Sequence, residues 1–172
     1  GISTGKHAWI DQCEFVQNPT AEDFLTEIKA TGAANTADGL TVTNCYAYGI
    51  DASAVEFIEI TDDIVSLTVL DNVVLKTAGT QSPLVLQAGT NTSFGTNIQR
   101  NFLQSSQTAT DLLIDNGAST NTGIIAHNRC KHKDVSGAHI LIDMTGCGLF
   151  DNLSVSTDVL SGFVWPAIDV DL

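Results

Sequence analysis

The sequence predicts an all-β fold in which short strands repeat along a single domain spanning residues 1–172. Two landmarks recur in step. The first is an apolar triplet that returns at a nearly even spacing, at Ile58–Ile60, Leu84–Leu86, Leu112–Ile114, Ile140–Ile142 and Ile168–Val170. The second is an asparagine that returns at almost the same spacing, at Asn44, Asn72, Asn101, Asn128 and Asn152. Two landmarks with one period indicate a repeat architecture.

The apolar runs are three to five residues long and rich in Ile, Val and Leu, which makes them too short for helices. The connections between them are rich in Thr, Ser, Asn and Gly, the residues of turns. No connection has a helical periodicity long enough to supply the crossover helices of α/β folds. Short strands at this period fit a parallel β-helix of about six coils, one coil per repeat.

The predicted elements follow this period along the chain. Residues 1–38 are expected to form an N-terminal cap and an irregular first coil, and residues 39–172 the regular coils. The later coils are carried by LTVTNC and FIEI, LTVLDN and LVL, NIQRN and LLI, IIAHN and ILI, and LFDN and AIDV.

The N-terminal stretch is ambiguous. Thr20 stands three positions before Asp23, and Phe24, Leu25 and Ile28 follow at helical spacing, which favours a short helix that covers the open end of the stack. The alternative is a first strand, because Ile28 precedes Ile58 by about one repeat.

The charge of the chain restricts its partners. A net charge of −13 with only seven Lys and Arg argues against nucleic acid or an anionic membrane surface. No apolar run approaches the roughly 20 residues of a membrane-spanning helix. The chain begins at Gly1 instead of Met, which predicts a processed product or a fragment.

The four cysteines have no close spacing such as C-x-x-C, which argues against a zinc site or a redox motif. Cys13 and Cys45 nevertheless occupy equivalent positions, because each follows the polar landmark, Gln12 in one repeat and Asn44 in the next. They are therefore expected to lie over each other, either as a disulfide or as two buried free thiols.

The phrase GIIAHNRC, Gly123 to Cys130, resembles the repeat phrase of right-handed parallel β-helix proteins. That superfamily includes pectate lyases, polygalacturonases and the shafts of phage tailspikes. The resemblance covers residues 9–170 and implies a right-handed helix. For a virion shaft it also implies a homotrimer and an extracellular or virion-associated location. The same shaft carries many functions, so activity has to be argued from surface positions.

Equivalent positions of successive coils stack about 4.8 Å apart, so the sequence can be read as rows of side chains. The centres of the triplets are expected to point outward, because their neighbours are apolar throughout. Those centres are Glu59, Val85, Leu113, Leu141 and Asp169. The aliphatic stripe Val85, Leu113 and Leu141 predicts an interface between copies. The alternative is that another part of the chain covers it.

Three aspartates that follow the triplets, Asp115, Asp143 and Asp171, would also stack. Stacked carboxylates repel unless a cation such as Ca²⁺ is bound between them. The alternative is that no cofactor is bound and each aspartate caps a turn.

The residues before the asparagines form a charged row, Thr43, Asp71, Arg100, His127 and Asp151. A histidine held between an arginine and an aspartate can act as a general base or change its charge near neutral pH. The alternative is a surface charge ladder in which each pair contributes little stability.

The motifs of polygalacturonase-like enzymes are mostly missing. Those enzymes combine Asn-x-Asp, Asp-Asp, His-Gly and Arg-x-Lys, whereas this chain has only Asp62-Asp63 and Arg129-Cys130-Lys131, more than two repeats apart. Aromatic candidates for sugar binding are Tyr46, Tyr48 and Trp165. The sequence therefore predicts a non-enzymatic structural or attachment module of the phage virion or tail-fibre type. The alternative is a carbohydrate-binding or polysaccharide-degrading β-helix protein that recognises a surface glycan at the charged row.

Overall fold

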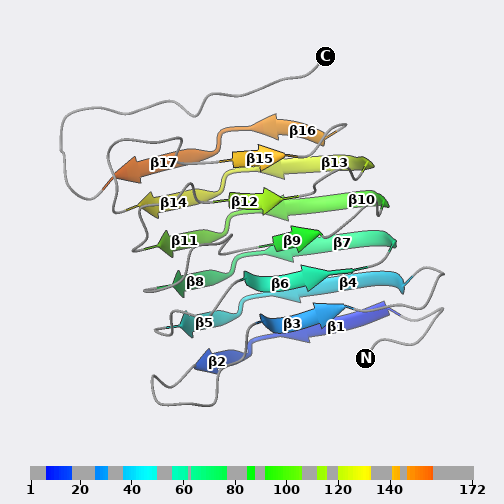
Figure 1. The fold of residues 1–172 in the computed structure, drawn as a ribbon, viewed down its shortest axis with the longest axis horizontal. Coiled ribbons are helices and arrows are strands. Elements are labelled where there is room, and N and C mark those ends of the chain that lie inside the picture. Colours follow the sequence, from blue (N-terminus) through cyan, green and yellow to red (C-terminus); the bar gives the residue numbers. More distant parts are fainter. Residues whose placement is uncertain are drawn as a thin grey trace.

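The fold is all-β and parallel. The computed structural model describes residues 7–16, 26–30, 37–49, 56–61, 63–76, 85–87, 92–105, 112–115, 120–132, 141–143 and 147–156. Within these ranges every regular element is a strand and none is a helix, which confirms the predicted all-β class. Figure 1 shows the strands of successive repeats lying one above the other, from the N-terminal repeat upward.

The strands form three parallel sheets, and each strand pairs with the strand three places later in the chain. The first sheet contains β1 (His7–Asp11), β4 (Ala37–Thr43), β7 (Ile64–Leu70), β10 (Thr92–Gln99), β13 (Thr120–Ala126) and β16 (Cys147–Phe150). The second contains β2 (Glu14–Val16), β5 (Tyr46–Gly49), β8 (Val73–Lys76), β11 (Phe102–Ser105), β14 (Arg129–His132) and β17 (Leu153–Ser156). The third contains β3 (Thr26–Ala30), β6 (Glu56–Ile60), β9 (Val85–Gln87), β12 (Leu112–Asp115) and β15 (Leu141–Asp143). Each repeat therefore contributes strands to the sheets in a fixed order.

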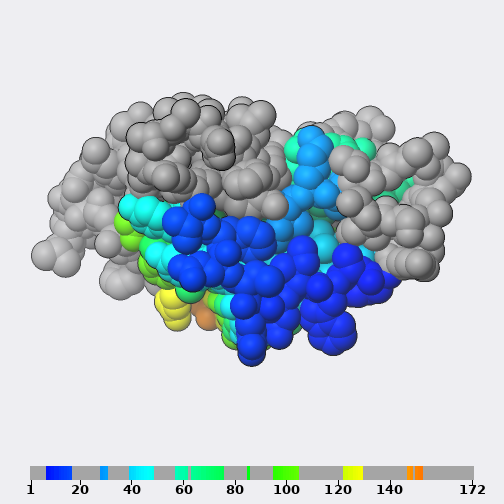
Figure 2. All heavy atoms as spheres, turned by 90° about the horizontal axis from the view of Figure 1, so that it is seen from below, coloured from blue at the N-terminus to red at the C-terminus, as the bar shows by residue number. Residues whose placement is uncertain are grey.

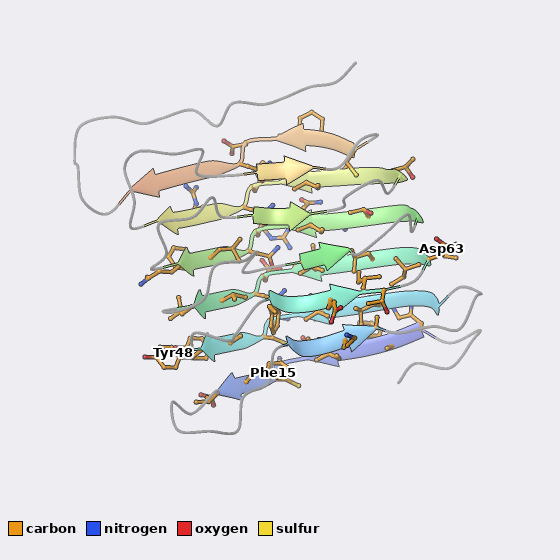
Figure 3. The ribbon with its side chains drawn as sticks, in the orientation of Figure 1. Phe15, Tyr48 and Asp63 are labelled. Atoms are coloured by element: carbon orange, nitrogen blue, oxygen red, sulfur yellow. The ribbon has the colours of Figure 1, made fainter. Side chains whose placement is uncertain are left out.

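One hydrophobic core lies between the sheets. Side chains alternate along each strand, so one face of each sheet is apolar and buried. The buried set draws on all three sheets: Leu40, Val42, Leu67, Val69 and Ile98 from the first, Ala47, Val74 and Leu103 from the second, and Ile28, Ile58, Ile60 and Val85 from the third. Phe15 of β2 adds an edge-on contact with Phe57 of β6, with ring centroids 5.6 Å apart (Figure 3). Each large aliphatic side chain buried here stabilises the fold by about 1.5–3 kcal/mol.

A two-residue corner joins the strands of the first sheet to those of the second. The first corner residue has a positive φ between 47° and 58° in every repeat, at Gln12, Asn44, Asp71, Arg100, His127 and Asp151. In the first five of these residues the backbone N–H donates to a carbonyl of the next repeat, as from Gln12 to Thr43 at 3.1 Å and from Asp71 to Gln99 at 3.2 Å. The corner therefore continues the inter-repeat hydrogen bonding while it turns the chain.

Gly123, the first residue of the GIIAHNRC phrase, is required by a close backbone approach. Its φ of 148° is rarely adopted by residues with a side chain, and a Cβ there would lie 1.9 Å from the carbonyl oxygen of Thr96. The pairing between β10 and β13 shifts register between Ser93 and Thr96, and Gly123 accommodates this irregularity.

The expectation of an N-terminal helix is wrong for residues 26–30, which form β3. This strand pairs with β6 and places Ile28 opposite Ile58, so the alternative of a first strand is confirmed. The burial alternates, with Ile28 and Ala30 buried and Lys29 exposed, because a strand has a side-chain period of two. Thr20, Asp23, Phe24 and Leu25 lie outside the described residues.

The predicted outward position of Val85 is also wrong. Val85 is completely buried, because β6 and β9 pair one position out of step with the triplets, so that Val85 and not Leu84 lies opposite Ile58. A slip of this kind turns every side chain of a strand to the opposite face. Val85 also pairs with Ile114, whereas Leu141 pairs with Leu112. Val85, Leu113 and Leu141 therefore do not share a row, and the side chains of the two leucines lie outside the described part of the structure.

Candidate functional site

The corner between the first and second sheets carries two rows of side chains, one exposed and one directed inward. The exposed row consists of the positive-φ residues, and it is the predicted charged row with one correction. Asn44, not Thr43, occupies the position equivalent to Asp71, because the N–H groups of both residues make the same hydrogen bond to the next repeat. From the sequence, Asn44 was expected to stand with the other recurring asparagines, which form the neighbouring inward row.

The inward row is a ladder of four asparagines, Asn72, Asn101, Asn128 and Asn152. The first three are at most 1% exposed. In each, Nδ2 donates to a backbone carbonyl of the preceding repeat and to Oδ1 of the next asparagine, as from Asn101 to Val69 and Asn128, both at 2.9 Å. The Oδ1 atoms of Asn101, Asn128 and Asn152 also accept the backbone N–H of the preceding row member. Four of the five asparagines that recur in the sequence therefore form one ladder.

Two cysteines complete the inward row in the first two repeats. Cys45 stands where Asn44 is expected, and its N–H donates to Oδ1 of Asn72 at 2.9 Å. Cys13 occupies the equivalent position in the first repeat. Asp11 pairs with Thr43 before the corner and Glu14 pairs with Tyr46 after it, and the two pairs are separated by the same number of residues along the chain. The expectation that Cys13 and Cys45 lie over each other is confirmed by this register.

Asp71 and Arg100 form a bidentate ion pair on the exposed row. Arg100 Nε donates to Asp71 Oδ1 at 2.8 Å and Nη2 donates to Oδ2 at 2.7 Å. These hydrogen bonds hold the pKa of Asp71 below its usual range and raise the pKa of Arg100. The side chains of Arg100 and Asp71 are 51% and 40% exposed, so solvent screens the attraction and the pair contributes little stability.

His127 and Asp151 form the second pair of the exposed row, with Nδ1 of the histidine 3.1 Å from Oδ2 of the aspartate. The predicted charged row is thus divided into two pairs, and each pair links adjacent repeats. A histidine oriented by a carboxylate has the geometry of a general base, which makes this pair the most reactive arrangement of the row.

A polar cluster around Asp11 links the first repeat to the second. Asp11 Oδ1 accepts hydrogen bonds from Thr43 Oγ1 at 2.7 Å and from Asn44 Nδ2 at 2.9 Å. The bond from Asn44, and then that from Thr43, lower the pKa of the Asp11 carboxyl. His7 Nε2 also lies 2.7 Å from Thr41 Oγ1. Thr43, predicted as a member of the charged row, therefore serves this junction.

The predicted acidic row is only partly within the described structure. Asp115 and Asp143 are paired in register on β12 and β15, but Asp115 lies opposite Leu86 and not Gln87 on β9. The side chains of Asp115 and Asp143, and the whole of Asp171, lie outside the described residues. Among the side chains that the structure describes, no three His, Cys, Asp or Glu groups are close enough to hold a metal ion.

The outer face of the second sheet carries an apolar patch that the sequence reasoning missed. Strand register and alternating burial place its members on one surface, and they are Val16, Tyr46, Tyr48, Val73, Leu75 and Phe102. Val16 is 60% and Tyr46 38% exposed, and the others are half-buried. The sequence signal is that inward and outward side chains alternate directly after each corner, in the triplets EFV, YAY, VVL and FLQ. We call these six residues the outer apolar patch.

The tyrosines proposed for sugar binding belong to this patch. Tyr46 and Tyr48 point outward from β5, and Figure 3 shows Tyr48 directed away from the ribbon at the end of that strand. Trp165 lies outside the described residues. Asp63 stands directly before β7 of the first sheet, and Arg129 begins β14 of the second sheet two repeats later, so these two residues belong to different sheets and different repeats.

Comparison with known proteins finds no counterpart. The chain matches no protein-family model, and no curated protein and no solved structure is significantly similar to it. Within the ranges that the structure describes, no helix is long and apolar enough to span a membrane.

Proposed function

We propose that this chain is a right-handed parallel β-helix that serves as a non-enzymatic structural or attachment module, of the kind found in phage virion or tail-fibre shafts. The observation that carries the proposal is the asparagine ladder, which links four successive repeats through amide hydrogen bonds. Three parallel sheets visited in a fixed order support the same architecture.

A ladder of this kind suits a mechanical role. Each amide in its middle is held by hydrogen bonds from both sides, so the corner of one repeat cannot shift without breaking bonds to its neighbours. The ion pairs Asp71–Arg100 and His127–Asp151 also run between repeats, parallel to the ladder. The polar groups of this edge thus satisfy one another along the stack.

We propose that the module assembles as a homotrimer through the outer apolar patch. The net charge of −13 makes copies repel each other, so an association surface has to be one that lacks charge. The patch fits this requirement, because the charged side chains that the structure describes on the same face, Glu14 and Arg129, stand at its two ends. This surface replaces the stripe of Val85, Leu113 and Leu141.

Light scattering of the wild type and of Leu75→Asp tests the association. Three 18.2 kDa chains give a mass of about 55 kDa, and a charge placed in the middle of the patch is expected to reduce it to that of one chain. The matched control is Thr68→Asp, a half-buried outward position of the first sheet, which leaves the mass unchanged. Circular dichroism verifies that both variants fold. A monomeric wild type rejects the trimer.

The exposed tyrosines support a second candidate, a carbohydrate-binding or polysaccharide-degrading β-helix protein. Tyr46 and Tyr48 project from one strand onto one face, and sugar rings stack on such aromatic surfaces. The pairs Asp71–Arg100 and His127–Asp151 are the polar groups that would recognise or cleave the glycan. A glycan array probed with wild type, Tyr46→Ala and His127→Ala tests this. Binding lost in both variants supports recognition, and no binding of the wild type at millimolar sugar rejects it.

A further inference from the structure

We propose that Cys13 and Cys45 are the two halves of a reversible disulfide that locks the first repeat onto the second. Both are free thiols in this structure. Their positions in the inward row make them neighbours across two repeats, at the point where the asparagine ladder ends. This inference is independent of whether the module binds glycans or forms a trimer.

The backbone geometry of the pair suits a disulfide. Cys13 and Cys45 lie between two in-register strand pairs, Asp11 with Thr43 and Glu14 with Tyr46. Neighbouring strands are about 4.8 Å apart, within the range of about 4.4–6.8 Å for Cα separations in disulfides. The two thiols also occupy equivalent local positions, each donating to the carbonyl two residues earlier. Cys13 Sγ lies 3.4 Å from the Asp11 oxygen and Cys45 Sγ lies 3.1 Å from the Thr43 oxygen. Both side chains also lie on the same side of the corner, because Cys45 belongs to the core and Cys13 packs against it.

The two thiols differ in access, which sets the order of reaction. Cys13 is half-buried, whereas Cys45 is 2% exposed, and this burial raises the pKa of the Cys45 thiol. Cys13 is therefore the sulfur that an external reagent reaches first. The Cys13 thiolate attacks a small disulfide such as oxidised glutathione, forms a mixed disulfide and releases one glutathione thiolate. Cys45 then loses its proton, attacks Sγ of Cys13 and releases the second. Two protein thiols are oxidised, and one glutathione disulfide is reduced to two thiols.

The location gives the disulfide a structural effect. In the later repeats, amide hydrogen bonds tie the corners together, but Cys45 and Cys13 have no amide side chain to extend the ladder. β1 and β2 are the terminal strands of their sheets and pair with a described strand on one side only. Figure 2 shows the first repeat, in blue, facing outward at this end. A covalent bond from Cys13 to Cys45 would hold this end against fraying.

The experiment treats the reduced full chain with oxidised glutathione under native conditions. The remaining thiols are then alkylated, and the peptides are mapped by mass spectrometry. We expect two of the four cysteines to resist alkylation and to appear as a Cys13–Cys45 cross-link. Hydrogen exchange of β1 and β2 should slow several-fold on oxidation and recover with dithiothreitol. Cys147→Ser is the matched control, because Cys147 lies on β16 at the other end of the first sheet from β1.

The variants Cys13→Ser and Cys45→Ser should abolish the cross-link. Cys13→Ser should also leave Cys45 unmodified by glutathione in the folded protein, because Cys45 is buried. Should a serine variant fail to fold, the peptide map of the wild type decides alone. Glutathione adducts that persist without a cross-link would overturn the proposal. So would a disulfide that involves Cys130 or Cys147, or one between two chains.

Discussion

Asn101 illustrates how one side chain can hold three repeats together. Its Nδ2 donates to Val69 in the preceding repeat and to Asn128 in the next, and its Oδ1 accepts from both the backbone and the side chain of Asn72. All of these groups are buried, so water cannot replace a lost partner. An asparagine is suited to this position because a single planar amide both donates and accepts.

Replacing Asn101 by alanine is expected to destabilise the fold by about 2–5 kcal/mol, because it leaves several buried polar groups of neighbouring repeats without partners. Urea denaturation monitored by circular dichroism measures the change. The matched control is Asn97→Ala in β10, where the asparagine faces outward and accepts a hydrogen bond from Gln99. The control should lower the free energy of unfolding by less than about 1 kcal/mol. Equal costs for the two variants would contradict a structural role for the ladder.

Individual strands differ in how firmly the sequence specifies their register. The corner fixes the strands that flank it, since a positive-φ residue and an inward residue follow each other in every repeat. The third sheet has no comparable corner beside it in the described residues. Its pairing shifts between Leu112 and Ile114, and Val85 is offset by one position from the place that the triplets suggest. Short apolar triplets therefore identify the strands but not which of their side chains face the core.

The ion pair between corners gives a prediction for pH dependence. The pKa of Asp71 is lowered in the folded chain, so its contribution to stability is present above the ordinary pKa of an aspartate and is lost as the pH falls through the lowered value. Arg100→Gln should therefore lower the stability of the fold slightly at pH 7 and leave it almost unchanged below the folded pKa of Asp71.

Urea denaturation at neutral and strongly acidic pH measures the difference between Arg100→Gln and the wild type. Arg129→Gln is the control, because it removes the same charge from another exposed position. Should both variants show the same pH dependence, the effect belongs to the net charge of the chain and not to the pair.

Two features of the whole molecule have opposite effects on association between copies, the net charge of −13 and the outer apolar patch. The charge makes copies of the chain repel each other over a distance that shortens as the salt concentration rises. The patch favours association only when two copies are in contact. The proposed trimer is therefore expected to respond to ionic strength.

Raising the salt from about 0.05 M to about 0.5 M should therefore strengthen the proposed trimer, because screening weakens the repulsion and leaves apolar burial intact. Sedimentation velocity over a range of protein concentrations measures the shift toward the trimer. Leu75→Asp should remain monomeric at both salt concentrations. An assembly that dissociates on adding salt would show that ion pairs, and not the patch, hold it together.

The amino-acid sequence alone was enough to predict the all-β class, the repeat period, the recurrence of the four asparagines that form the ladder and the equivalence of Cys13 with Cys45. These follow from local patterns that recur at each corner, where the spacing between neighbouring residues is constant. The three-dimensional pairing was needed to establish that residues 26–30 are a strand, that Val85 faces the core and that Asn44 belongs to the exposed row. The cause is the side-chain period of two, since adding or removing one residue between strands reverses which side chains face inward. The pairing partner, and not the spacing of similar residues, sets that register.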